Sequence, residues 1–160
     1  TTVEVMHTDA EGRLVLADAL TYAERFKPKA ILDTATLTGA ALVALGQHAS
    51  ALLSKDDALR EQLQALGEDT GDYVWPLPLW DEYKDSVKSV RADIANIDSP
   101  TNRFGGTITG GIFLSHFVPK KVPWAHIDIA PRMDSIPSDK LAKGSTGEPV
   151  RLLVKFVEQY

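Results

Sequence analysis

The densest group of chemically capable side chains lies near the N-terminus, in the run Thr8-Asp9-Ala10-Glu11-Gly12-Arg13. In an extended backbone, side chains two residues apart point the same way, so Asp9 and Glu11 would aim at one point. Converging carboxylates repel each other unless a cation lies between them, and oxygen ligands suit Mg²⁺, Mn²⁺ or Zn²⁺. Arg13 would open a helix, where its guanidinium and the free backbone N–H groups favour an anion. A cation site beside an anion site is an arrangement suited to hydrolysis.

Spacing alone favours a simpler interpretation of the same residues. Acidic residues are common at the start of helices, so Asp9 and Glu11 would be first-turn acids and Arg13 would be solvated. An EF-hand is excluded, because Arg13 stands at the fifth loop position, which needs an oxygen donor. The choice between a cation site and first-turn acids stays open on spacing.

The segment from Thr34 to Gly39 follows a predicted strand and precedes a predicted helix. Ligands of open α/β sheets bind outside the carboxyl ends of strands, which would place this turn at the wall of a cleft. Ordinary N-capping of the helix by Thr36 or Thr38 explains the same residues equally well.

Other polar groups give weaker signals. The glycine-rich run 104–111 lacks the Gly-Lys-Ser/Thr ending of a phosphate-binding loop, so close backbone packing is the better explanation. Asp33 and Asp128 stand in apolar strands and need partners if they are buried. The histidines have no ligand spacing, and each is interpreted as a core or surface residue: His7, His48, His116 and His126.

The elements that must position these residues alternate between strand and helix. Hydrophobic periodicity predicts strands at 3–7, 30–35 and 124–130, a short apolar run at 49–53, and helices at 13–26, 38–45, 56–67, 108–117 and from Pro149 to Tyr160. Residues 72–107 are predicted to be loop-rich with one short helix at 81–86, and Ser145 and Glu148 have capping-box spacing. This order predicts a layered α/β/α fold around a central mixed, mostly parallel sheet.

Length and composition exclude several classes of protein. The chain has 160 residues, with 44% hydrophobic and 24% charged residues, which is typical of a globular domain or a large piece of one. A net charge of −5 without a basic run argues against a nucleic-acid partner. No stretch is apolar enough for a membrane span. The chain contains no cysteine and begins with Thr1 inside an apolar segment, so it gives no targeting information.

The run His7–Leu14 resembles the signature octapeptide of the leucyl aminopeptidases, the cytosol aminopeptidase family (peptidase family M17), except that His7 replaces the usual Asn. Further segments are similar to family blocks in the same order, and together they cover nearly the whole chain: 34–40, 71–72, 75–79, 92–97, 124–130 and 143–150. The resemblance implies that residues 1–160 are the C-terminal portion of a catalytic domain.

The resemblance also implies roles for individual residues. Asp9 and Glu11 match metal ligands, with Glu11 bridging two divalent ions (Mn²⁺, Zn²⁺ or Mg²⁺), and Arg13 matches the catalytic arginine that holds bicarbonate as general base. Thr36 and Leu37 match residues whose backbone carbonyls hold the substrate. The wall of the side-chain pocket is matched by Gly39, Ala130 and Met133, although Pro131 stands where the family usually has Gly.

The implied activity is that of a metalloaminopeptidase, which removes leucine-like N-terminal residues from peptides. Family members are cytoplasmic and assemble as hexamers, so a homo-hexamer is expected. The family's remaining ligands, one lysine and two aspartates, lie upstream of the octapeptide, and the 160 residues alone are therefore expected to be inactive. The alternative is a catalytically dead relative that serves as an assembly module, although the intact Asp9, Glu11 and Arg13 argue against it.

Overall fold

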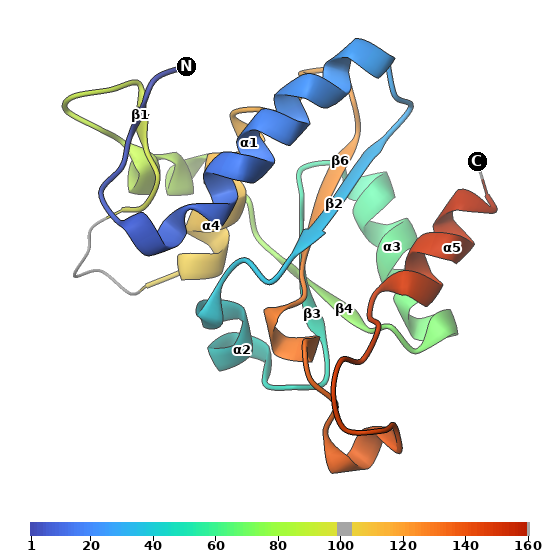
Figure 1. The fold of residues 1–160 in the computed structure, drawn as a ribbon. Coiled ribbons are helices and arrows are strands. Elements are labelled where there is room, and N and C mark those ends of the chain that lie inside the picture. Colours follow the sequence, from blue (N-terminus) through green and yellow to red (C-terminus); the bar gives the residue numbers. More distant parts are fainter. Residues whose placement is uncertain (99–103, 160) are drawn as a thin grey trace.

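A four-stranded mixed sheet forms the centre of the computed structural model, which describes residues 1–98 and 104–159 (Figure 1). Its strands follow the order β2 (Ile31–Ala35), β6 (Trp124–Asp128), β3 (Ser50–Ser54) and β4 (Val74–Leu77). The β2–β6 and β3–β4 pairs are parallel, and β3 runs antiparallel to β6. A separate two-stranded sheet pairs β1 (Val3–Glu4) with β5 (Ile94–Ala95). The predicted mixed, mostly parallel sheet is confirmed.

Helices cover both faces of the sheet. Helices α1 (Gly12–Ala23) and α4 (Gly106–Ser115) lie on one face, and α3 (Asp57–Thr70) and α5 (Val150–Val157) lie on the other (Figure 1). Neighbouring residues of β3 point into opposite cores, because Leu53 packs with the α1 and α4 side chains and Leu52 with those of α3 and α5. The layered α/β/α architecture is therefore confirmed.

The carboxyl ends of β2 and β6 meet at one end of the sheet, next to α2 (Gly39–Leu45) (Figure 1). Short 3₁₀ helices connect the larger elements at Thr8–Ala10, Glu24–Phe26, Asp81–Val87, Ala130–Arg132 and Pro137–Asp139. Within residues 1–98 and 104–159, no helix is long and apolar enough to cross a membrane.

Local sequence explains the helices that were predicted well. Asp56 caps α3 by accepting a hydrogen bond from the Leu59 N–H at 2.9 Å, and Leu59, Leu63 and Leu66 form its buried stripe. In α4, Gly111 allows close contact with β3, because a Cβ at this position would lie 2.9 Å from Leu53 Cδ1. These features place α3 and α4 directly against opposite faces of β3.

Two strands within the predicted loop-rich segment 72–107 were missed. Strand β4 contains Pro76, which argues against a central strand but is tolerated at the edge of a sheet, where β4 lies. Strand β5 has only the residues Ile94–Ala95, too few for a periodic pattern. Residues 99–103 of this segment, and Tyr160 of the predicted closing helix, lie outside the described residues.

The predicted capping box at the start of the last helix is wrong. Helix α5 begins at Val150, and its N-cap residue Pro149 offers no side-chain hydrogen bond. The buried carboxylate of Asp72, just after the C-terminal end of α3, caps α5 instead. Its Oδ2 accepts a hydrogen bond from the Leu152 N–H at 3.1 Å. Glu148 turns instead toward Arg132.

Candidate functional site

Asp9 and Glu11 lie on a tight turn between β1 and α1, not on an extended segment as the sequence analysis assumed. Residues Thr8–Ala10 form a 3₁₀ helix, and Glu11 already has helical dihedral angles (φ −74°, ψ −33°). The turn forms because His7 Nδ1 accepts a hydrogen bond from the Asp9 N–H at 3.2 Å. Both carboxylates are exposed, and neither accepts a hydrogen bond within the part of the chain that the structure describes.

A buried asparagine that directly follows β5, Asn96, holds this turn in place. Asn96 Oδ1 accepts a hydrogen bond from the Met6 N–H at 2.8 Å, and Asn96 Nδ2 donates to the backbone oxygen of His7 at 2.8 Å. Its own backbone oxygen accepts from Arg13 Nη1 at 2.6 Å. Asn96 therefore connects the carboxylate-bearing turn to Arg13, a role that the sequence analysis did not assign.

Arg13 is the second residue of α1, as predicted, but it is only 7% exposed. The interpretation that left it solvated is wrong, because its guanidinium points inward to Asn96 and lies beside Gly110 of α4. Burial lowers the pKa of Arg13 from its usual value, and the negative charge of Asp128 opposes that shift. Within the described residues its buried Nε atom has no hydrogen-bond partner. A buried unpaired donor of this kind fits an anion.

The Thr36–Thr38 turn connects β2 to α2 and is anchored on Asp128 at the end of β6. Asp128 Oδ1 accepts from the Leu37 N–H at 3.0 Å, and its Oδ2 accepts from Thr38 Oγ1 at 2.7 Å. Thr38 Oγ1 also accepts from the Ala41 N–H at 3.3 Å and so caps α2. The capping interpretation of this segment is therefore confirmed for Thr38, and Gly39 is the first residue of the capped helix.

The predicted pocket residues Ala130 and Met133 lie on and just after the 3₁₀ helix Ala130–Arg132. Ala130 is buried and donates its N–H to Asp128 Oδ1 at 3.2 Å, whereas the Met133 side chain is 50% exposed. Pro131 is buried in the first turn of this helix, where its fixed φ is favourable.

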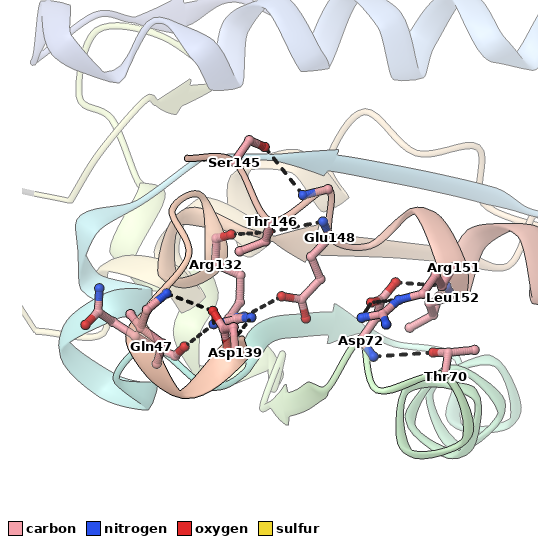
Figure 2. A network of polar contacts seen from close by, with 12 residues as sticks. Gln47, Thr70, Asp72, Arg132, Asp139, Ser145, Thr146, Glu148, Arg151 and Leu152 are labelled. Atoms are coloured by element: carbon pink, nitrogen blue, oxygen red, sulfur yellow. Dashed lines mark hydrogen bonds and ion pairs between the residues drawn. The ribbon is translucent and has the colours of Figure 1, made fainter. Parts of the chain in front are cut away.

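An ion-pair network centred on Arg132 holds the 3₁₀ helix Ala130–Arg132 in place (Figure 2). Arg132 Nε donates to Glu148 Oε2 at 2.6 Å, its Nη2 donates to Asp139 Oδ1 at 3.1 Å, and its Nη1 donates to the backbone oxygen of Gln47 at 2.5 Å. Burial raises the pKa of Glu148 to about 7, although the positive charge of Arg132 acts in the opposite direction. We call Gln47, Arg132, Asp139 and Glu148 the Arg132 network.

The site residues form one connected group only in part. Asp128 joins the Thr36–Thr38 turn to Ala130, and Asn96 joins Arg13 to the turn that carries Asp9 and Glu11. In residues 1–98 and 104–159, no three His, Cys, Asp or Glu side chains cluster as a metal site. The two exposed carboxylates fit divalent cations by their chemistry, but they supply only part of the ligands that such ions need.

Residues 1–154 match the sequence model of the catalytic domain of the cytosol aminopeptidase family. The probable cytosol aminopeptidase of Azoarcus sp. (strain BH72) is 54% identical over 156 residues, covering 98% of this chain and 30% of that protein. The probable cytosol aminopeptidase of Methylobacillus flagellatus is 52% identical over 158 residues, again with 30% of its length covered. The chain therefore spans about 30% of the curated relatives that it matches.

Solved structures agree with this similarity. A mutant of tomato leucine aminopeptidase superposes with a TM-score of 0.89 at 40% identity, over 99% of this chain and 30% of that one. The bottromycin maturation enzyme BotP superposes with a TM-score of 0.92, also at 40% identity, over 99% of this chain and 35% of the other. The fold and the order of its elements are thus those of both enzymes over the shared region.

Proposed function

Because this chain belongs to the cytosol aminopeptidase family, we propose that it forms part of the catalytic domain of a two-metal aminopeptidase. Its substrates would be peptides with a free N-terminus, preferably one that begins with a leucine-like residue. One observation carries the proposal: the exposed carboxylates of Asp9 and Glu11 have no hydrogen-bond partners in the described structure and lie four and two residues, respectively, from the buried Arg13.

Asp9 and Glu11 would hold divalent metal ions, with Mn²⁺ and Zn²⁺ as the first candidates and Mg²⁺ as the third. When bound, such ions polarise the scissile carbonyl and lower the pKa of water, which is the chemistry that peptide hydrolysis needs. The 3₁₀ turn at Thr8–Ala10 presents both carboxylates to solvent at little cost, because exposed carboxylates need no desolvation. Further ligands must complete the site, since these two side chains leave most coordination positions unfilled.

Arg13 would hold an anion beside the metal ions, with bicarbonate as the group that the family resemblance suggests. Its buried Nε supports this role, because an unpaired N–H in a desolvated position binds an acceptor strongly. Asn96 restricts the guanidinium by accepting from Nη1 and so orients the remaining donors. A bicarbonate held there would act as general base during hydrolysis.

The substrate would lie against the Thr36–Leu37 turn and the pocket formed by Gly39, Ala130 and Met133. Ala130 is buried and held by a hydrogen bond, whereas Met133 is half exposed and has a flexible, unbranched side chain. This combination suits an apolar pocket of moderate selectivity. The names of the relatives support a cytoplasmic location, and the family resemblance supports a homo-hexamer. Neither a nucleic acid nor a membrane is proposed as a partner.

The competing proposal is a catalytically dead relative that serves in assembly. Binding of Mn²⁺ separates the two proposals, because a dead scaffold has no need of a loaded site. In the full-length protein, calorimetric titration with Mn²⁺ should give a saturable signal, and the loaded enzyme should release product from leucine p-nitroanilide.

Asp9→Ala and Glu11→Ala should abolish both signals while the fold, followed by circular dichroism, is retained. Asp18→Ala is the matched control, since Asp18 is another exposed carboxylate on α1 outside the site. Absence of Mn²⁺ binding and of leucine release in the wild-type full-length protein would end the aminopeptidase proposal. The 160-residue chain alone should release no leucine, because it carries only two of the expected ligands.

A further inference from the structure

Asp128 makes several hydrogen bonds to the candidate substrate region, and none of the roles described so far explains them. It is fully buried at the carboxyl end of β6 and accepts hydrogen bonds from the Leu37 N–H at 3.0 Å, Thr38 Oγ1 at 2.7 Å and the Ala130 N–H at 3.2 Å. These donors come from the substrate turn and from the pocket wall. One carboxylate therefore connects the turn, whose Leu37 and Thr38 lie 91 and 90 residues before it in sequence, to Ala130, which lies two residues after it.

The hydrogen bond to Leu37 determines where the preceding carbonyl points. The peptide group between Thr36 and Leu37 is planar and trans, so its carbonyl oxygen and its N–H face in opposite directions. Because the N–H points to the buried Asp128, the Thr36 carbonyl points away from it, on the exposed side of the turn. Within the described residues, the Thr36 oxygen accepts no backbone hydrogen bond and is thus open to a ligand.

Close packing against α4 also holds this turn in place. A Cβ at Gly110 would lie 3.2 Å from Leu37 Cδ2 and 3.4 Å from Thr38 Cγ2, so the glycine lets the helix approach the turn closely.

We propose that Asp128 is a positioning residue of the aminopeptidase site, which holds the Thr36–Leu37 peptide and the Ala130 backbone so that the Thr36 carbonyl faces the substrate. This inference rests on the proposed function and adds to it a residue that touches neither metal nor substrate. A carboxylate is required in this position because it accepts three hydrogen bonds while also supplying a full negative charge. An amide has one acceptor oxygen and no charge.

Asp33 provides a matched control within the same sheet. It is a second strand acid with a largely buried side chain, at 13% exposure, and it accepts from Trp124 Nε1 at 2.6 Å and pairs with His126 Nδ1 at 2.5 Å. Both of its partners lie on β6, and neither belongs to the substrate turn or the pocket wall. Asp33→Asn therefore disturbs a buried carboxylate without touching the groups that Asp128 positions.

The test compares wild type, Asp128→Asn and Asp33→Asn in the full-length, Mn²⁺-loaded enzyme. Asp128→Asn should lower kcat/KM for leucine p-nitroanilide about a hundredfold, the loss expected when a reacting group is misplaced by about 1 Å. Mn²⁺ affinity should stay at the wild-type value, because Asp128 makes no contact with Asp9 or Glu11. Asp33→Asn should lower the thermal midpoint but leave kcat and KM at wild-type values.

A second pair of variants tests the hydroxyl contact of Asp128 separately. Thr38→Val removes the hydrogen bond to Asp128 together with the cap of α2, but it leaves the Leu37 N–H bound to the carboxylate, so KM should rise and kcat should change little. Thr38→Ser should restore the wild-type KM, because it returns the hydroxyl. Hydrogen exchange of the Leu37 amide should be faster in Asp128→Asn and unchanged in Asp33→Asn.

The outcomes distinguish this inference from the proposed function. A wild-type enzyme that binds no Mn²⁺ and releases no leucine overturns the proposed function and, with it, the role of Asp128. An active wild-type enzyme in which Asp128→Asn behaves like Asp33→Asn overturns the positioning role alone. Unchanged exchange at Leu37 in a folded Asp128→Asn variant has the same consequence.

Discussion

The carboxylate pair at the start of α1 and the Arg132 network differ in how completely their charges are paired. Asp9 and Glu11 are exposed and accept no hydrogen bonds within the described residues. The Arg132 side chain, by contrast, is 11% exposed, and its guanidinium contacts two carboxylates and a backbone oxygen (Figure 2).

The comparison indicates that some charged residues of this fold stabilise it, whereas others remain available for chemistry. A buried charge must be paired, because an unpaired one costs several kcal/mol, and all three guanidinium nitrogens of Arg132 donate to structural partners. Exposed carboxylates cost little to leave free and remain available to a ligand. Substitutions in the first region should therefore change activity and those in the second should change stability.

The largest expected effect is the loss of activity when the free carboxylates are neutralised. Asp9→Asn or Glu11→Asn should lower leucine release by the full-length enzyme more than about a hundredfold. Loss of a residue that only supports a metal ligand costs up to about a hundredfold, and loss of a ligand itself should cost more. The free energy of unfolding of the metal-free protein should change by less than about 0.5 kcal/mol, since exposed side chains without partners are replaced. Kinetic assays and urea unfolding measure the two effects, and a large loss of stability would contradict the contrast.

The next largest effect is on stability, at the centre of the network. Arg132→Met leaves Glu148 and Asp139 without their cation and should lower the free energy of unfolding by about 3–5 kcal/mol. The double variant Arg132→Met with Glu148→Gln should recover part of this loss, because one unpaired carboxylate is removed. Chemical denaturation of both variants gives the values. An unchanged midpoint in Arg132→Met would mean that the network contributes nothing.

Glu148 should also make stability depend on pH. Its pKa is raised from 4.5 to about 7 in the folded protein, mainly by burial. Between these pH values the folded chain holds a proton that the unfolded chain has released, so stability should fall as the pH rises from 4.5 to about 7. Glu148→Gln cannot titrate and should lack this decline. Unfolding midpoints measured across this range compare the two proteins, and parallel curves would contradict the assignment.

The smallest expected effect concerns His7, which replaces the family's Asn. His7 acts as N-cap of the 3₁₀ turn through Nδ1, and an Asn side chain can accept the same hydrogen bond. His7→Asn should therefore change stability by less than about 1 kcal/mol and leave leucine release near the wild-type rate. Should Mn²⁺ affinity fall sharply in this variant, the histidine would be a metal ligand rather than a cap.

Local sequence was sufficient wherever a single element supplied both the pattern and its explanation. The stripe Leu59, Leu63 and Leu66 predicted α3, and the apolar run before Thr34 predicted β2. Strand β4 was missed because proline is unfavourable within a central strand. Pro76 is tolerated because β4 lies at the edge of the sheet. The closing helix was predicted but its cap was not, since Asp72 reaches it from a distant part of the chain.

The candidate site shows the same limit. The octapeptide predicted roles for Asp9, Glu11 and Arg13, but the surroundings of these residues depend on Asn96, which lies 83 residues beyond Arg13. The burial of Arg13 and the turn at Thr8–Ala10 depend on the long-range hydrogen bonds of Asn96, and the spacing of residues in the sequence cannot reveal such bonds. Asp128 was recognised as an unusual strand acid that needs partners, but the partners themselves became visible only in the folded chain.

The glycines of α4 restrict where this site can evolve. A methyl group at Gly111 would collide with Leu53 and Leu79, and one at Gly110 would press on Leu37. Growth of any side chain on that helix face would therefore disturb the sheet or the Thr36–Thr38 turn, whereas Met133 is half exposed and has room to vary. If the proposed function is right, changes in the size of accepted N-terminal residues should arise at position 133 and its neighbours, while α4 keeps its small residues as the spacer against β3.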